Sequence, residues 1–133
     1  MARILVIDHD ALMRATVAAI LKSAGHEVTL AEDGWRGFSL CHVSHVDVAI
    51  ICLFMPDQGG LEALKSLRKE FPSLPTIAFS TRAGGKDLSA FARWLGATRT
   101  LAKPCGAEAL LAAIEEVHAV NRDRSDRSGA PVA

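Results

Sequence analysis

Chemically capable side chains follow four short apolar runs of the chain. They are, in chain order, Asp8-His9-Asp10, Cys52, Ser80-Thr81 and Lys103-Pro104. An acid, a hydroxyl and a lysine that meet could bind a phosphoryl group or a small anion, because the ammonium group balances its charge. Taken singly, Asp8 could cap a helix and Lys103 could be a solvated surface charge. Four such positions at one edge of a sheet would point to a common site.

Asp8, His9 and Cys52 also have the composition of a site for zinc or another borderline metal, with three ligands and an open fourth position. In the alternative interpretation, Cys52 is a small buried hydrophobe that closes a strand, and His9 is a solvated loop residue. A third possibility is redox sensing. A thiol at Cys52 beside Lys103 is expected to have a lowered pKa and to be open to reversible oxidation.

The elements that must position these residues alternate along the chain. Continuous apolar runs at 3–7, 48–53 and 76–79 are typical of strands buried on both faces, and weaker strands are expected at 27–31 and 98–101. Apolar residues at helical spacing lie between them, at 13–21, 61–71, 88–95 and 110–117, with a less regular segment at 34–43. This alternation predicts an α/β fold with a doubly wound, five-stranded parallel sheet, whose functional crevice lies at the carboxyl ends of the strands.

Composition narrows the class of protein. The 133 residues suffice for one domain, and 15 Lys and Arg balance 15 Asp and Glu, which removes the basic field that non-specific nucleic-acid binding needs. The longest stretch without charged residues, 71–81, is too short for a membrane helix, and Asp8 and Asp10 argue against a signal peptide. Three cysteines without CxxC spacing favour a reducing compartment. We therefore expect a cytoplasmic protein that binds neither nucleic acid nor membrane.

The other two cysteines are predicted to have structural roles, and the end of the chain is predicted to lack regular structure. Cys41 is expected to fill space on the second helix, and Cys105 to pack against the last helix. The apolar pattern ends near residue 121, and the mixed-charge segment 122–133 predicts a disordered tail. A single domain at 1–121 follows.

Several short motifs resemble the receiver domain of two-component response regulators. They are Ile4-Leu5-Val6-Ile7-Asp8, Met55-Pro56 followed by Gly60-Leu61, Leu74-Pro75 leading to Ser80, Leu95-Gly96-Ala97 and Lys103-Pro104. The resemblance covers residues 2–120. It implies a flavodoxin-like (βα)5 three-layer sandwich with strand order 2-1-3-4-5, and a signalling domain rather than an enzyme.

The resemblance also implies roles for the residues at the strand ends. In that family two acids after the first strand bind Mg²⁺, and an aspartate ending the third strand accepts a phosphoryl group. A hydroxyl after the fourth strand and a lysine hold the phosphate. An aromatic on the fifth strand reports the phosphorylation state to partner proteins. Carried over, the first acid is Asp8, the hydroxyl Ser80 and the lysine Lys103. His9 stands at the second acid, Cys52 at the acceptor, and Thr100 at the aromatic switch position.

These departures predict a degenerate site. Cysteine forms no acyl phosphate and is not a hard ligand, so Asp8 alone would bind Mg²⁺ weakly or not at all. Asp10 is expected to cap the first helix, and Asp57 lies five residues beyond Cys52 along the chain. The chain is therefore interpreted as a stand-alone, degenerate receiver in a two-component phosphorelay that acts by protein–protein interaction. The alternative is a thiol- or metal-sensing receiver that uses Cys52, His9 and Asp8, with Zn²⁺ as the speculative ion.

The expected partners are a sensor histidine kinase, another signalling protein, or a second copy of the chain. Pairing would use the fourth helix, fifth strand and fifth helix. Trp94 lies at the edge of the apolar face of the fourth helix, where it could either bind a partner or cover the helix edge. Trp35 has the same two interpretations on a different face of the molecule. A cysteine hydrolase is disfavoured because no strained elbow motif surrounds Cys52. A flavodoxin-type cofactor carrier is disfavoured because the loops lack a Ser/Thr/Gly-rich phosphate cradle.

Overall fold

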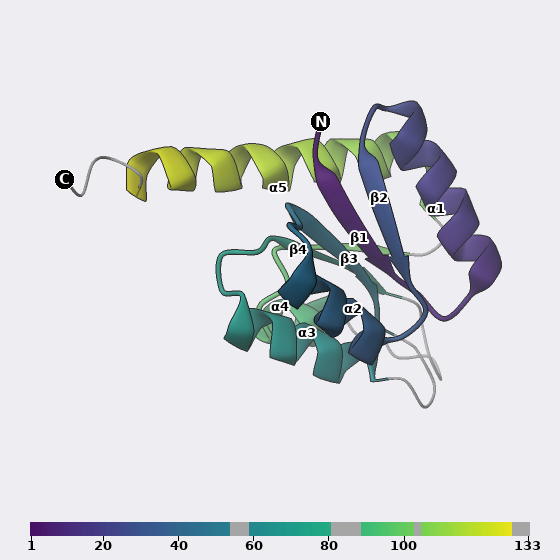
Figure 1. The fold of residues 1–133 in the computed structure, drawn as a ribbon, viewed down its shortest axis with the longest axis horizontal. Coiled ribbons are helices and arrows are strands. Elements are labelled where there is room, and N and C mark those ends of the chain that lie inside the picture. Colours follow the sequence, from purple (N-terminus) through teal and green to yellow (C-terminus); the bar gives the residue numbers. More distant parts are fainter. Residues whose placement is uncertain (54–58, 81–88, 103–104, 129–133) are drawn as a thin grey trace.

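The computed structural model describes residues 1–53, 59–80, 89–102 and 105–128. Five strands form one sheet, with the order β2-β1-β3-β4-β5 and every neighbouring pair parallel (Figure 1). The strands are β1 (Arg3–Ile7), β2 (Glu27–Ala31), β3 (Val48–Cys52), β4 (Thr76–Ser80) and β5 (Arg99–Ala102). This confirms the predicted doubly wound parallel sheet and its strand order.

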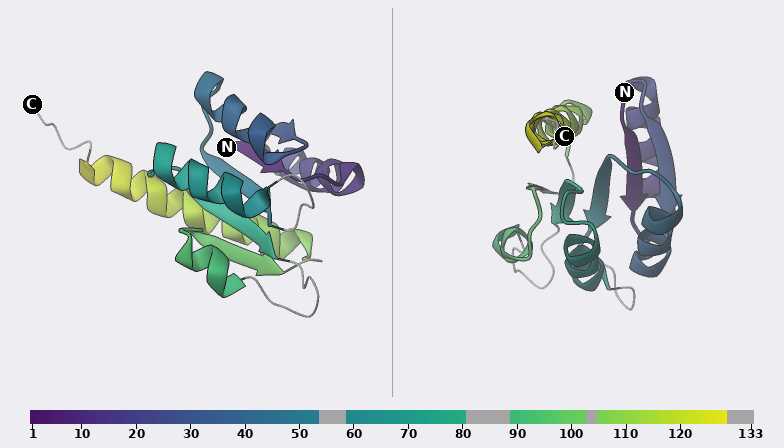
Figure 2. Two further views of the ribbon diagram at one scale, coloured as in Figure 1. Left: turned by 90° about the horizontal axis from the view of Figure 1, so that it is seen from below. Right: turned by 60° about the vertical axis from the view of Figure 1, so that its left-hand side comes forward.

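Helices cover both faces of the sheet and make three layers (Figure 2). They are α1 (Ala11–Ser23), α2 (Gly34–Val43), α3 (Gly60–Glu70), α4 (Ser89–Trp94) and α5 (Ala107–Ser128). α1 and α5 pack on one face, while α2, α3 and α4 pack on the other. The sheet is therefore buried on both sides, as the continuous apolar runs predicted.

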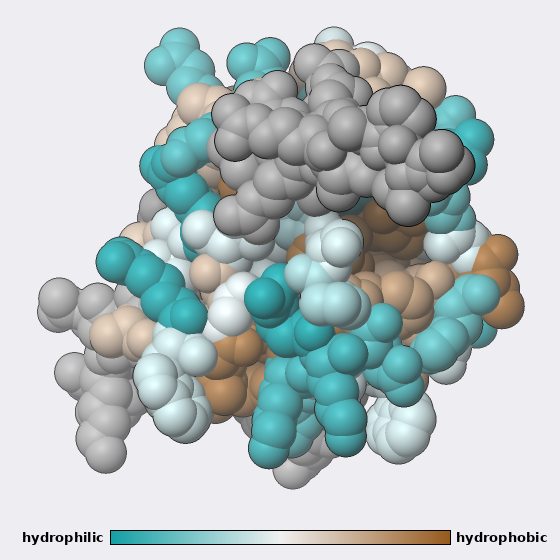
Figure 3. Space-filling model, turned by 90° about the vertical axis from the view of Figure 1, so that its left-hand side faces the viewer, coloured by the Kyte–Doolittle hydropathy of each residue, from teal (hydrophilic) through white to brown (hydrophobic). Residues whose placement is uncertain are grey.

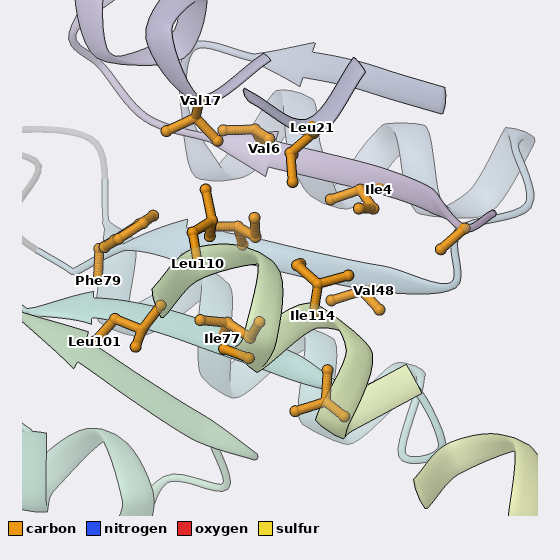
Figure 4. Packing of buried hydrophobic residues seen from close by; sticks show 14 residues of the cluster. Ile4, Val6, Val17, Leu21, Val48, Ile77, Phe79, Leu101, Leu110 and Ile114 are labelled. Carbon is orange, nitrogen blue, oxygen red and sulfur yellow. The ribbon is translucent and has the colours of Figure 1, made fainter. Parts of the chain in front are cut away.

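Alternate residues of each strand divide the core into two clusters. Ile4 and Val6 of β1 point toward α1 and α5, where they meet Val17 and Ile114 (Figure 4). Leu5 and Ile7 belong to the cluster beneath α2 and α3. Because side chains alternate along a strand, a strand that faces helices on both sides must be apolar at every position.

The second helix contains two glycines, which made it the least regular of the predicted helices. A Cβ built on Gly37 would lie 2.3 Å from Cδ1 of Ile7, so any larger residue here would force the Ile7 side chain to move. Asp33 begins the helix, and its Oδ1 accepts a hydrogen bond of 2.7 Å from the backbone N–H of Arg36. Packing and a side-chain cap thus compensate for the poor intrinsic helix propensity of glycine.

The last helix is longer than the sequence indicated. α5 continues to Ser128, whereas the composition predicted an irregular, disordered tail from residue 122. The helix thus extends over residues 122–128, while the domain boundary at residue 121 stays a prediction and residues 129–133 lie outside the described residues.

The outer surface is mixed in character. On the face that lies at the left in Figure 1, hydrophilic residues cover much of the surface, with smaller hydrophobic areas between them (Figure 3). Among the described residues, no helix has both the length and the apolar character that crossing a membrane requires.

Candidate functional site

The carboxyl ends of β1, β3 and β4 bring three of the predicted site residues to one edge of the sheet. Cα partners are Ile7 with Ile51, and Cys52 with Phe79. Asp8 therefore follows β1 directly beside Cys52, and Ser80 ends β4 on the other side of Cys52. The strand order reverses at β1, which is where functional crevices form in sheets of this kind.

Asp8 is a buried carboxylate, with 2% of the residue exposed. Its Oδ1 accepts a hydrogen bond of 3.0 Å from the backbone N–H of Asp10, and its own N–H donates to the Ala31 carbonyl at 3.1 Å. Arg14 of α1 donates through Nη1 to the Asp8 carbonyl at 2.6 Å. The bond from Asp10 orients the carboxylate and gives this buried acid a partner, while the other two bonds hold the backbone of Asp8. No motif in the sequence indicates the contact with Arg14.

His9 lies beside that carboxylate but reaches solvent. Its side chain is 41% exposed, and Nδ1 lies 3.5 Å from Oδ1 of Asp8. Asp10, the other acid of the loop, is the N-cap of α1, and its Oδ1 accepts from the N–H groups of Leu12 at 2.9 Å and Met13 at 3.3 Å. The prediction that Asp10 caps the first helix is confirmed, so its carboxylate is engaged in hydrogen bonds to the first turn of α1.

Cys52 is almost completely buried, with 1% of the residue exposed, and it packs in the cluster beneath α2 and α3. The ligand atoms of Asp8, His9 and Cys52 all lie within 4.8 Å of one another. The structure thus brings a carboxylate, an imidazole and a thiol into a single cluster at the sheet edge.

The N-terminus of α3 fixes the strand end that carries Cys52. A Cβ built on Gly60 would lie 2.4 Å from the carbonyl oxygen of Cys52 and 2.6 Å from that of Leu53. Only glycine fits at this point of contact. The Gly60-Leu61 motif pointed to this residue in the sequence, although not to the contact that it makes.

The remaining predicted site residues are spread over β4 and β5. Ser80 is 6% exposed and pairs in register with Ala102, the residue before Lys103. Thr100, at the predicted switch position, is half-buried on β5 opposite Ala78. Lys103 and Asp57 lie outside the described residues.

The other two thiols do not take part in this cluster. Burial raises the pKa of the Cys41 thiol to about 11, and it also raises the pKa of the Cys105 thiol. Cys41 packs against the α2 and α3 side of the core, and Cys105 against the α1 and α5 side. Both behave as the space-filling residues that the sequence predicted.

A cleft between α2 and α3 was not predicted. It encloses about 460 Å³, and Trp35, Phe38, Glu62 and Ser66 are among its lining residues. Trp35 is 80% exposed in the structure. The presence of this tryptophan was the sequence feature that pointed to this surface.

Comparison with known proteins agrees with this architecture. A family model described as the response regulator receiver domain matches residues 4–115. The chain belongs to this family. It is 33% identical over 119 residues to protein PilH of Pseudomonas aeruginosa, covering 88% of this chain and 98% of PilH.

Two solved structures have the same fold. A CheY-like receiver domain protein from Methanospirillum hungatei superposes with a TM-score of 0.85 at 26% identity, over 93% of this chain and 98% of that protein. NtrX from Brucella abortus gives a TM-score of 0.88 at 26% identity, over 96% of this chain but only 28% of NtrX. Receiver domains are signalling domains that interact with sensor kinases and other signalling proteins.

Receiver domains bind Mg²⁺ at the acceptor site, and the donor atoms that the described residues bring together here do not fit that ion. Mg²⁺ takes oxygen ligands in a near-ideal octahedron. Among the described residues, the cluster at the sheet edge offers one carboxylate from Asp8, together with the nitrogen of His9 and the sulfur of Cys52. Nitrogen and sulfur donors suit zinc and similar borderline or soft ions instead.

Proposed function

We propose that this protein is a degenerate receiver domain that acts by protein–protein interaction in a two-component pathway, without forming an aspartyl phosphate. One observation carries the proposal: the strand end at which the family resemblance puts the phosphoryl acceptor holds the buried thiol of Cys52. An acyl phosphate forms only on a carboxylate. A thiol at this position therefore removes the covalent step of the usual switch.

Neighbouring carboxylates are engaged in structural contacts. Oδ1 of Asp8 accepts from the N–H of Asp10, and Asp10 itself caps α1. Asp33, which precedes α2, caps that helix through the N–H of Arg36. Asp57 follows Cys52 by five residues in the sequence and lies outside the described residues. These contacts support the view that no other acid replaces Cys52.

The test is the intact mass of the full chain after incubation with acetyl phosphate, and separately with sensor kinases of the source organism. The proposal expects no stoichiometric adduct. A stoichiometric, acid-labile phosphoryl group mapped to any aspartate would sink it.

The surface formed by α4, β5 and α5 is the proposed contact with a second copy of the chain. Trp94 ends α4 and is 78% exposed, and large aromatic side chains dominate the binding energy of many interfaces. Arg99 of β5 forms an ion pair with Glu116 of α5 on the same part of the molecule. A surface that carries an exposed aromatic and an ion pair is suited to a symmetric contact, in which each copy presents the same patch.

Sedimentation over a range of protein concentrations tests this contact. We expect the native chain to dimerise, and Trp94→Ala to weaken the dimer by more than about tenfold, as hot-spot truncation does. Trp35→Ala is the matched control, because Trp35 is 80% exposed on α2. A monomeric native chain, or equal effects of the two variants, contradicts the proposal.

The redox alternative has less support. Oxidation requires a thiolate that reagents can reach, and Cys52 is 1% exposed. An alkylation rate for Cys52 well above that of Cys105, which is half-buried, would favour redox sensing instead.

A further inference from the structure

We infer that Asp8, His9 and Cys52 form a binding site for a thiophilic divalent cation, with Zn²⁺ as the ion that fits best. The ligand atoms of these three residues lie within 4.8 Å of one another at the carboxyl edge of the sheet. The inference goes beyond the proposed function. It holds or fails independently of whether an aspartate of this chain accepts a phosphoryl group.

One separation between ligand atoms matches a tetrahedral zinc site, and all three ligand atoms lie within 4.8 Å of one another. Bonds of about 2.0–2.1 Å to nitrogen and oxygen and about 2.3 Å to sulfur place ligand atoms roughly 3.4 Å (N to O) and 3.6 Å (S to N or O) apart. Nδ1 of His9 is 3.5 Å from Oδ1 of Asp8, so this pair is already at the required separation. Because the ligand atoms lie within 4.8 Å of one another, the sulfur of Cys52 has to move roughly 1.2 Å at most toward the other ligand atoms to reach the separation of about 3.6 Å.

Two ligands are fixed and the third can adjust. Asp8 and Cys52 are 2% and 1% exposed, and the N–H of Asp10 holds the carboxylate at 3.0 Å. Outer-shell hydrogen bonds of this kind orient the ligands of metal sites. The His9 side chain is 41% exposed, so its ring can rotate to adjust its distances to the other two ligand atoms. Its exposure also leaves the fourth coordination position open to water.

The chemistry of the ligands selects the ion. Thiolate and imidazole favour Zn²⁺ and other borderline ions over Mg²⁺ and Ca²⁺, which require oxygen ligands. Binding needs the thiolate form of Cys52, so the S–H bond breaks, a sulfur–metal bond forms, and the proton leaves to solvent. No electron is transferred. Affinity is therefore expected to rise with pH, as it does wherever a metal displaces a ligand proton.

A surface pair of the same chain provides a control for non-specific binding. Nε2 of His45 lies 2.8 Å from Oδ1 of Asp47, while Oδ2 of Asp47 accepts from the N–H of Arg3. This pair offers an imidazole and a carboxylate but no thiol among the described residues within ligand distance. His45→Ala therefore removes a two-ligand pair and leaves the proposed site intact.

The experiment titrates the full chain, purified without added metal, with Co²⁺ alone and with Zn²⁺ alone. Co²⁺ replaces Zn²⁺ in tetrahedral sites and reports a bound thiolate by a sulfur-to-cobalt charge-transfer band. We expect one ion per chain, the charge-transfer band, and full displacement of Co²⁺ by Zn²⁺. Absence of the band in the native chain overturns the inference.

Variants assign the ligands. Cys52→Ala and Cys52→Ser are expected to abolish the charge-transfer band, with circular dichroism confirming that each variant is folded. His9→Ala changes an exposed side chain and is expected to weaken binding by more than about tenfold, since losing even an outer-shell partner costs that much. Cys105→Ala and His45→Ala should bind as the native chain does. A band that survives both Cys52 variants, or that disappears in Cys105→Ala, contradicts the site.

Discussion

Replacement of Gly60 by alanine probes how α3 holds the strand end that carries Cys52. The new Cβ would lie 2.4 Å from the Cys52 carbonyl oxygen and 2.6 Å from that of Leu53. Both oxygens belong to the backbone, so neither can rotate away as a flexible side chain would. Forcing one methyl group into such a contact costs about 1–3 kcal/mol.

The expected net change is a loss of about 2 kcal/mol in the free energy of unfolding. Gly60 is the first residue of α3, where alanine has a helix propensity better than glycine by about 1 kcal/mol. A steric cost at the upper end of its range exceeds that gain. For a domain of this size, the loss lowers Tm by roughly 8 °C, at about 4 °C per kcal/mol.

Thermal unfolding followed by circular dichroism, with urea unfolding beside it, measures the effect. Gly106→Ala is the matched control, because a Cβ built there meets no atom within 4 Å. We expect its stability to change by less than about 1 kcal/mol, the size of local propensity effects. If Gly60→Ala is as stable as the native chain, or more so, α3 does not pack on this strand end and the fixed position of Cys52 loses its support.

Three further outcomes are expected. Asp10→Ala removes the cap of α1 and should lower the free energy of unfolding by about 1 kcal/mol, and a neutral result would exclude the cap. Burial first, then the N-terminus and His118, lower the pKa of His26 from its usual 6.5, so the unfolded chain takes up a proton at higher pH than the folded one. Stability should therefore fall as pH falls below about 6.5, and His26→Gln should flatten that part of a pH series of unfolding curves. The double variant His9→Asp/Cys52→Asp restores two carboxylates at the strand ends, and we expect it to gain an acid-labile phosphoryl group at position 52 when treated with acetyl phosphate; a double variant that folds and stays unmodified would show that more than these two residues prevents the reaction.

The strands could be predicted from the sequence because burial on both faces of the sheet requires continuous apolar runs. Ala49 and Ile51 face one layer of helices while Val48 and Ile50 face the other, so β3 is apolar at every position. The same reasoning placed Asp8 and Cys52 at one edge, since all strands run parallel. Asp10 could also be identified as a helix cap, because its side chain accepts hydrogen bonds from backbone N–H groups only two and three residues away.

Contacts between distant segments left no comparable signal. In the sequence Gly37 indicates a weak helix, yet its missing side chain leaves room for Ile7, which lies against it. The hydrogen bond from Arg14 to the Asp8 carbonyl depends on how α1 turns back over β1, which spacing alone does not reveal. The extent of α5 was also missed, since the charged residues after 121 lack the apolar stripe by which the preceding turns were found.

The absence of an aspartyl phosphate is tested by the mass of the native chain after treatment with acetyl phosphate, measured beside the His9→Asp/Cys52→Asp variant under identical conditions. A chain whose acceptor position is the buried thiol of Cys52 should remain at its unmodified mass. A stoichiometric phosphoryl group on an aspartate of the native chain would contradict the account.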